Sequence, residues 1–156
     1  DAFPGCHFVI KEHPSFPLSI QDVVKPDSQI RFANSANTRT LIEGADAVIT
    51  VNSTVGLEAL TLGRNVITLG DAHYAIDGLV LRADNRAALH EAFATLDGWQ
   101  PDEARRRRFI RFVYNRFLVP MARTDPGKQA LTLLSDRAAG QDAYSRALKA
   151  RKAATA

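Results

Sequence analysis

The stretch that decides the fold runs from residue 47 to residue 69 and reads AVITVNSTVGLEALTLGRNVITL. It opens and closes with apolar runs rich in Val and Ile, residues that favour β-strands. The segment between the two runs favours a helix that Asn52 or Ser53 can cap and that stops at Gly63. A strand, a helix and a second strand joined by short links predict a parallel β-sheet with a right-handed connection.

The same alternation extends over the first half of the chain. We expect buried strands at residues 7–10, 30–33, 47–51, 65–69 and 79–81. A short helix is expected over residues 38–44, capped by Asn37 or Thr38 and ended by Gly44. Nearly continuous apolar strands are typical of a sheet covered on both faces, so the fold class is α/β with a parallel sheet.

Strand signals cease after residue 83, where three helices are expected. They begin after Asn85, at Pro101 and at Asp125-Pro126. In the second helix four apolar residues share one face, which we expect to point inward while most of the neighbouring arginines, residues 105–108, stay solvated. The apolar residues are Phe109, Phe112, Val113 and Phe117.

The domain organisation follows from these elements. Residues 1–83 form the core of one domain, residues 84–137 its C-terminal helices, and residues 138–156 a basic tail that we expect to be frayed or ordered only against a partner.

Composition restricts the class of protein. The chain has 156 residues, of which 46% are hydrophobic and 24% charged, as in a globular domain rather than a disordered, collagen-like or disulfide-rich one. No run of eighteen apolar residues occurs, and the lone Cys6 forms no internal disulfide, so we expect a cytoplasmic location. Because the chain opens with Asp1, we expect a piece of a longer protein.

The charge is unevenly distributed. Residues 1–100 carry 7 Lys and Arg against 12 Asp and Glu, whereas residues 101–156 carry 13 against 5. A basic C-terminal third is compatible with nucleic acid, an anionic bilayer or an acidic partner domain, and charge alone does not choose among them.

Two segments carry candidate binding residues. In the first, Lys11, Glu12, His13 and Pro14 follow the first expected strand directly, where open α/β sheets bind their ligands. Pro14 keeps His13 extended, so Lys11 and His13 are candidates for a phosphate. The alternative is that His13 is an ordinary loop histidine whose ring is hydrogen-bonded to the backbone.

In the second segment, Ser53 and Thr54 precede a helix that contains Gly56 and Glu58. Two hydroxyls at a helix N-terminus, with a glycine that lets a ligand approach the backbone, can bind an anion. A carboxylate on the first turns can accept hydrogen bonds from sugar hydroxyls. The alternative is that Ser53 only caps the helix and Glu58 only favours its positive end.

Taken together, the two segments favour a phosphate held between them, because both follow strands that we expect to be near neighbours. We therefore expect His13 and Ser53 to lie close in space. Neither a dinucleotide-binding G-x-G-x-x-G nor a P-loop is present.

The order of these motifs resembles that of bacterial capsule polysaccharide biosynthesis proteins. The resemblance covers about residues 5–82 and is carried by VIKEHPS (9–15), LIEGADAVITVNSTVGLEAL (41–60), GRNVITLG (63–70), Tyr74 and Gly78-Leu79. It implies a Rossmann-like parallel sheet with C-terminal helices, forming one half of a glycosyltransferase of the two-domain GT-B type. Some members resemble enzymes that transfer Kdo from CMP-Kdo.

The resemblance also implies roles for matching positions. His13, beside Lys11, is similar to the residue that holds the nucleotide phosphate in related CMP-sugar transferases, and Ser53 and Thr54 to their paired hydroxyls. Glu58 is placed like a ribose-binding carboxylate. No catalytic residue is assigned, and no metal or other cofactor is expected.

The partners expected on this basis are a CMP-sugar donor, an N-terminal acceptor-binding domain, a lipid-linked saccharide acceptor and a peripheral contact with the inner membrane, but no nucleic acid. Two other functions stay open. One is glycerol phosphate transfer from CDP-glycerol, and the other is a non-catalytic module that docks on the capsule machinery through its basic helices.

Overall fold

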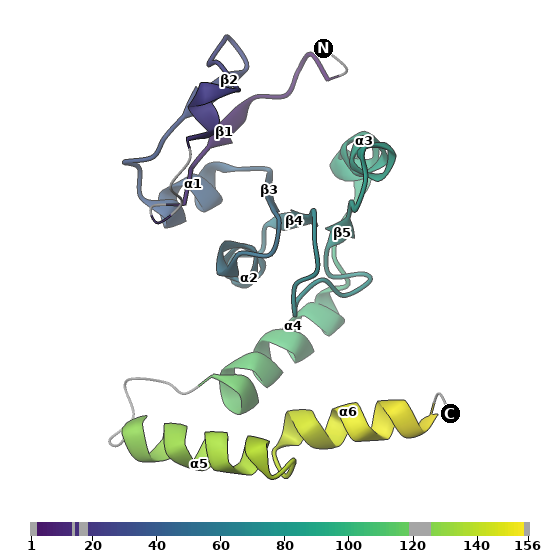
Figure 1. Cartoon of the computed structure of the whole chain (residues 1–156). Coiled ribbons are helices and arrows are strands. Elements are labelled where there is room, and N and C mark those ends of the chain that lie inside the picture. Colours follow the sequence, from purple (N-terminus) through teal and green to yellow (C-terminus); the bar gives the residue numbers. More distant parts are fainter. Residues whose placement is uncertain (1–2, 14, 16–18, 119–125, 155–156) are drawn as a thin grey trace.

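The chain folds into two parallel β-sheets with helices around them, as the computed structural model in Figure 1 shows. The structure describes residues 3–13, 15, 19–118 and 126–154. In the first sheet β1 (Phe8–Ile10) pairs with β2 (Ile30–Phe32). The second sheet has the order β3-β4-β5, formed by β3 (Ala47–Thr50), β4 (Asn65–Thr68) and β5 (Leu81–Arg82).

The described residues thus form two sheets where we expected one parallel sheet, although every expected strand is present in whole or in part and every strand pair is parallel. The chain leaves β2 through α1 (Thr38–Gly44) and enters β3 without pairing β3 to β1 or β2. Strand order depends on contacts between segments far apart in the sequence, and the periodicity of a single segment carries no information about them.

The remaining helices begin where polar side chains cap them. Asn37, Ser53 and Asn85 cap α1, α2 (Thr54–Thr61) and α3 (Arg86–Thr95), each accepting a hydrogen bond from a backbone N–H of the first turn, as expected. Asp102 caps α4 (Glu103–Phe112), which continues into a π-helical turn, η3 (Val113–Phe117). Two short 3₁₀ turns, η1 (Ile20–Asp22) and η2 (Leu96–Gly98), complete this part.

Strand β4 separates two cores. On one face Val66 packs with α1, α2 and the segment that follows β4, in a cluster that includes Ile42, Leu60 and Tyr74. On the other face Ile67 packs with Ala83 and with Ala92 of α3. Successive residues of a strand point to opposite faces, so α2 and α3 cover opposite faces of this sheet.

Helix α4 packs its apolar face inward, as expected. Phe109 contacts the first core, Val113 is buried, and the Phe117 ring stacks on His73 with 5.7 Å between ring centroids. Arg105, Arg107 and Arg108 are exposed, also as expected. Arg106 differs, because its side chain is only 16% exposed and donates hydrogen bonds to the carbonyl of Leu60 (2.6 Å) and to Glu103.

We expect Arg106→Ala to destabilise the intact protein by about 1–3 kcal/mol, because it removes the charge-assisted hydrogen bond to the Leu60 carbonyl that joins α4 to α2. The matched control is Arg108→Ala on the same helix, where the side chain is exposed and the cost is within about 0.5 kcal/mol. Chemical denaturation of both variants measures the difference, and equal midpoints would show that Arg106 does not anchor α4.

Helices α5 (Pro126–Ala138) and α6 (Ala143–Ala154) lie apart from the two sheets (Figure 1). Asp142 begins α6 by accepting hydrogen bonds from the backbone N–H groups of Tyr144 (3.0 Å) and Ser145 (3.2 Å). The structure places a helix within the tail, residues 138–156, which we expected to be frayed or ordered only against a partner. Low apolar periodicity conceals a helix of this kind, because Ala, Lys and Arg favour helices without forming an apolar face.

None of the helices in the described part of the chain combines the length and the apolar character needed to cross a bilayer.

Candidate functional site

The segment that follows β1 is hydrogen-bonded to the segment that follows β2. The Lys11 ammonium donates hydrogen bonds to the backbone carbonyls of Asn34 and Ala36, each at 2.7 Å. Two of its three N–H groups are thus used to join the two strand exits, and no described residue accepts a hydrogen bond from the third. Lys11 has a structural role here that the sequence did not reveal.

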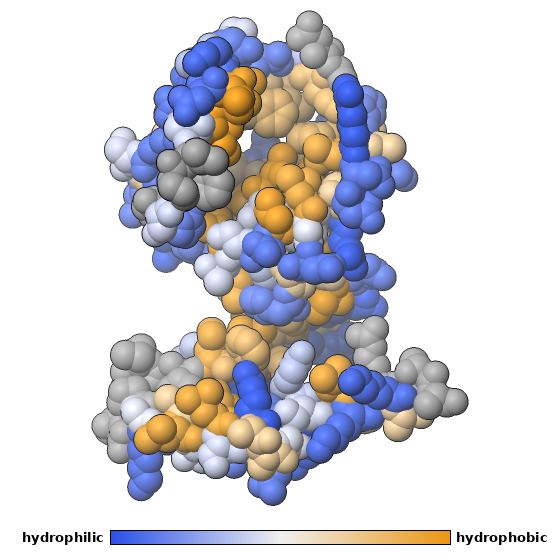
Figure 2. Space-filling model, viewed as in Figure 1, coloured by the Kyte–Doolittle hydropathy of each residue, from blue (hydrophilic) through white to orange (hydrophobic). Residues whose placement is uncertain are grey.

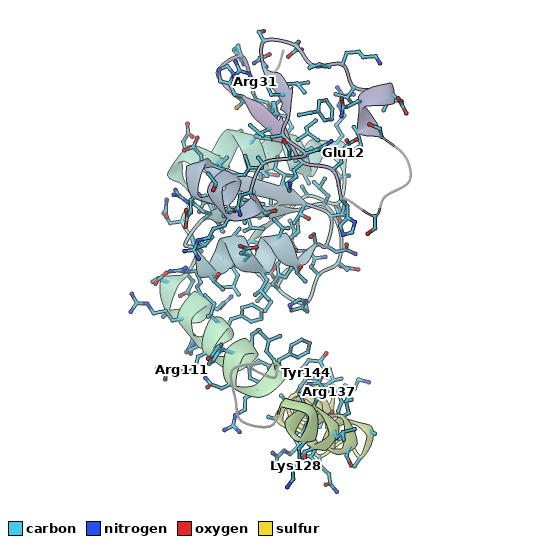
Figure 3. The ribbon with its side chains drawn as sticks, turned by 90° about the vertical axis from the view of Figure 1, so that its left-hand side faces the viewer. Glu12, Arg31, Arg111, Lys128, Arg137 and Tyr144 are labelled. Carbon is cyan, nitrogen blue, oxygen red and sulfur yellow. The ribbon has the colours of Figure 1, made fainter. Side chains whose placement is uncertain are left out.

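Glu12 organises the same loop. Its carboxylate accepts hydrogen bonds from the Asn34 side-chain amide (2.5 Å), the Ser19 hydroxyl (2.9 Å), the Ile20 backbone N–H (2.5 Å) and the Gln21 amide (3.3 Å). In return, the Asn34 side-chain oxygen accepts from the Glu12 backbone N–H (2.9 Å). Figure 3 shows Glu12 at the end of β1.

The hydrogen bonds from Asn34 and Ser19 lower the pKa of Glu12 to about 2, since they favour the charged carboxylate. A folded-state pKa below the ordinary value of 4.5 means that the loop is stabilised above about pH 4.5 and loses that stabilisation as the pH falls toward 2. We expect the Glu12 carboxyl to titrate near pH 2 by NMR in the intact protein. The protection of the η1 amides against hydrogen exchange should decrease over the same pH range.

Glu12→Gln is the control, because the side-chain amide of glutamine does not titrate. In this variant the protection of the η1 amides should no longer depend on pH in this way. A Glu12 midpoint near 4.5 would contradict the hydrogen-bonded arrangement.

His13 lies at the outer end of this loop with an exposed side chain. Its Nδ1 accepts a hydrogen bond from the backbone N–H of Ser15 at 3.2 Å. Because Nδ1 is the acceptor, the neutral ring carries its proton on Nε2, which is left to donate outward. The backbone thus orients His13, as the alternative interpretation expected, while no hydrogen bond among the described residues engages its Nε2. Pro14, which we expected to keep His13 extended, lies outside the described residues.

The second candidate segment forms the start of α2. The Ser53 hydroxyl accepts from the backbone N–H of Val55 (3.3 Å), and the Ser53 N–H donates to the Thr50 hydroxyl (3.2 Å). Ser53 is therefore the N-cap and is half-buried, whereas Thr54 is exposed. The first N–H groups of α2 and the Thr54 hydroxyl form a positively polarised end that suits an anion.

Gly56 has a packing role that the sequence did not reveal. A Cβ at this position would lie 2.5 Å from the Tyr74 hydroxyl oxygen and 2.7 Å from two of its ring carbons. The fully buried Tyr74 donates its hydroxyl to the Ser53 carbonyl, and burial raises the pKa of that hydroxyl. Because Gly56 has no side chain, the Tyr74 ring fits against α2 and can donate its hydrogen bond to the Ser53 carbonyl.

Glu58 lies on the second turn of α2 with a half-buried side chain. Its backbone carbonyl accepts from the Thr61 hydroxyl at 2.7 Å and from the Leu62 N–H at 3.0 Å. These bonds involve the backbone, so they leave the carboxylate available to a ligand.

The two candidate segments belong to different sheets. His13 follows β1, and Ser53 and Thr54 follow β3. Within the described residues, no hydrogen bond joins the His13 side chain to α2. Their proximity in space stays a prediction.

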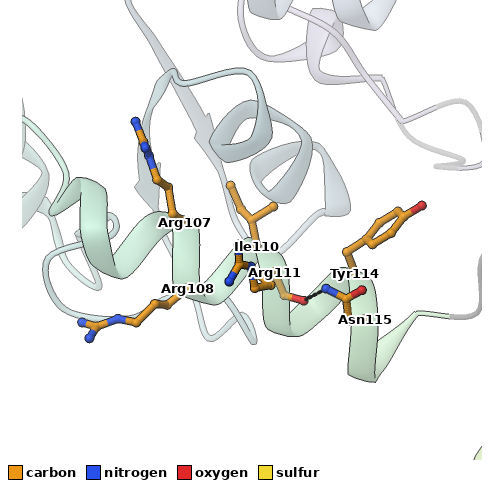
Figure 4. Close-up of a pocket in the computed structure, with 6 residues that line it drawn as sticks. All are labelled: Arg107, Arg108, Ile110, Arg111, Tyr114 and Asn115. Atoms are coloured by element: carbon orange, nitrogen blue, oxygen red, sulfur yellow. Dashed lines mark hydrogen bonds between the residues drawn. The ribbon is translucent and has the colours of Figure 1, made fainter.

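A surface pocket elsewhere lacks the features of a phosphate site. It lies on α4 and η3 and is lined by Arg107, Arg108, Ile110, Arg111, Tyr114 and Asn115. Figure 4 shows that the side chains of Arg107 and Arg108 diverge, so they do not converge on one point as donors around a phosphate do. Among the described residues, no group of three His, Cys, Asp or Glu is placed to hold a metal ion.

Sequence reasoning missed Asn34 and the role of Glu12. The available signal was the position of Glu12 between two candidate phosphate ligands, together with the position of Asn34 directly after a strand. Twenty-two residues separate Glu12 from Asn34, so their pairing is visible only once β1 and β2 are known to be neighbours.

Comparisons with known proteins agree with the resemblance seen in the motifs. The family described as "Capsule polysaccharide biosynthesis protein" matches residues 4–97. Protein FixF of Sinorhizobium fredii (strain NBRC 101917 / NGR234) is 49% identical over 119 residues, which are 76% of this chain and 29% of that relative. The chain thus spans less than a third of the length of this relative. No solved structure gives a significant match. The chain belongs to the capsule polysaccharide biosynthesis protein family.

Proposed function

We propose that the chain is the C-terminal, donor-binding half of a glycosyltransferase that transfers a sugar, Kdo from CMP-Kdo, in capsular polysaccharide biosynthesis. Membership of the family supports a role in capsule polysaccharide biosynthesis. The observation that carries the proposal is the His13 imidazole, exposed at a strand exit with Nδ1 hydrogen-bonded and with no described residue bonded to Nε2.

The proposed site binds the phosphate of CMP. His13 donates from Nε2, Lys11 supplies its remaining N–H, and the start of α2 supplies the Thr54 hydroxyl and backbone N–H groups, with Ser53 as its cap. Glu58 accepts hydrogen bonds from the ribose.

Negative charge grows on the phosphate as CMP leaves the sugar. Donors fixed at that phosphate therefore act most strongly in the transition state, which lowers the barrier to transfer. The Glu12 hydrogen bonds hold the His13 loop in place before the donor arrives, so less ordering is needed on binding. The acceptor, a lipid-linked saccharide, is bound by an N-terminal domain of the GT-B pair, and the protein works in the cytoplasm at the inner membrane.

Calorimetric titration of the intact protein with CMP, CMP-Kdo and CDP-glycerol tests this proposal. We expect CMP and CMP-Kdo to bind and CMP-Kdo to be consumed when acceptor is present. Consumption of CDP-glycerol instead would identify a glycerol phosphate transferase, and absence of binding by all three would remove the donor-site assignment.

The exposed arginines of α4 favour a second candidate, a docking module of the capsule machinery. Arg107, Arg108 and Arg111 are exposed on a helix that the structure places away from β1 and β2 (Figure 1). Binding of the intact protein to anionic vesicles, together with the absence of nucleotide binding, would favour this function.

A further inference from the structure

The two sheets face each other along unpaired edges. Strand β1 pairs only with β2, and β3 only with β4, among the described residues. Figure 1 shows β1 and β3 as the neighbouring edges of the two sheets, with β2 and β5 on the outside. Each of these inner edges presents backbone N–H and C=O groups that another strand can pair with.

The hydrogen bonds identify which groups point to the open edges. The Phe8 N–H donates to Gln29 (2.6 Å) and the Ile10 carbonyl accepts from Ala33 (2.9 Å), so Val9, between them, turns its N–H and C=O away from β2. The Thr50 carbonyl accepts from Leu69 (2.9 Å), so Ile49 turns its backbone groups away from β4 in the same way. Among the described residues no strand pairs with these two edges, so their backbone groups are open to another strand.

The side chains near the two edges are apolar and uncovered. Val9 is 55% exposed, Val51 57% and Ile49 37%. Figure 2 shows the molecule hollowed in the region between the first sheet and α3, with hydrophobic side chains around the hollow. Phe93 of α3 contacts Phe8 of β1 with ring centroids 5.7 Å apart, and Ala92 packs on the second sheet, so α3 bridges the two sheets on one side.

The path of the chain indicates what belongs between the edges. From β1 the chain moves outward to β2, crosses back through α1 to β3, and then moves outward through β4 to β5. In each sheet, successive strands along the chain are therefore added farther from the position between β1 and β3. In doubly wound sheets with the order 3-2-1-4-5-6, that central position belongs to the first strand.

We propose that a parallel β-strand of the same intact polypeptide, outside these 156 residues, lies between β1 and β3 and joins the two sheets into one. The resulting order is β2, β1, the added strand, β3, β4, β5. The chain spans only 29% of the length of Protein FixF, so that relative has ample further chain from which such a strand can come. Strand insertion pairs the backbone groups of Val9 and Ile49 and buries apolar surface on both faces.

Hydrogen exchange of the intact protein tests the proposal without any nucleotide. We expect the amides of Val9 and Ile49 to be protected as strongly as those of β4, whose central position is shown by its two partners. Fast exchange at Val9 and Ile49 beside slow exchange in β4 would overturn the proposal. Protection that disappears when a dimer is diluted to the monomer would also overturn it, since a second copy would then supply the strand.

A pair of variants at one position gives a second readout. Val9→Ala and Val9→Pro both remove the valine side chain, but only proline removes the N–H that faces the open edge. With a strand in place we expect Val9→Pro to melt several degrees below Val9→Ala. Equal melting temperatures would show that this N–H faces water, as it does where proline is tolerated on an edge strand, and would contradict the proposal.

Discussion

His13→Ala in the intact protein is expected to weaken CMP binding about tenfold to a hundredfold while leaving the fold unchanged. The lost interaction is a charge-assisted hydrogen bond from Nε2 to phosphate, worth about 1.5–3 kcal/mol. The His13 side chain is exposed and accepts a hydrogen bond from Ser15 of its own loop, so its removal costs within about 0.5 kcal/mol of stability. Calorimetry gives the affinity and thermal denaturation the stability.

The matched control for this prediction is His7→Ala, directly before β1, where the side chain is also exposed. His7→Ala should bind CMP as the unaltered protein does. If His13→Ala bound CMP normally but melted several degrees lower, His13 would be a structural residue, and the phosphate site built on it would have to be withdrawn.

Gly56→Ala is expected to destabilise the intact protein by about 1–3 kcal/mol, the usual cost of overpacking a core. The added Cβ would fall 2.5 Å from the Tyr74 hydroxyl oxygen, and Tyr74 is fully buried, so its ring has no solvent-exposed position to move into. Gly44→Ala is the control, because a Cβ there meets no atom within 4 Å. Urea denaturation of the two variants measures the contrast, and a Gly56→Ala midpoint equal to that of Gly44→Ala would contradict it.

A double-mutant cycle separates this clash from other effects. Tyr74→Ala alone should cost about 3–5 kcal/mol, as for other large buried aromatic residues. In the Tyr74→Ala background the clash is absent, so adding Gly56→Ala should cost much less than it does in the unaltered protein. Simple additivity of the two costs would show that Gly56 and Tyr74 do not interact.

The predicted elements agree with the structure where they depend on local chemistry. Asn37, Ser53 and Asn85 were recognisable as caps because a cap is a property of one residue and the turn that follows it. The strands were recognisable as apolar runs with flanking turn residues. For the same reason the family motifs and the candidate residues His13 and Ser53 could be identified without coordinates.

The parts that the sequence did not reveal depend on partners distant along the chain. The division into two sheets is set by which strand edges meet. The bonds of Glu12 to Asn34 and of Tyr74 to Ser53 each join segments about twenty residues apart. Arg106 was indistinguishable from its three neighbouring arginines, since only the carbonyl of Leu60, 46 residues away, distinguishes it.

Helix α2 is held at both ends by contacts of different kinds. The Tyr74 hydroxyl donates a hydrogen bond to the carbonyl of the cap residue Ser53, and the Arg106 guanidinium donates one to the carbonyl of Leu60 near the other end. An α-helix of eight residues is a stiff rod about 12 Å long, so it moves as a unit. Any shift of α4 that keeps the Arg106 hydrogen bond would therefore carry α2 and its Ser53 cap along with it.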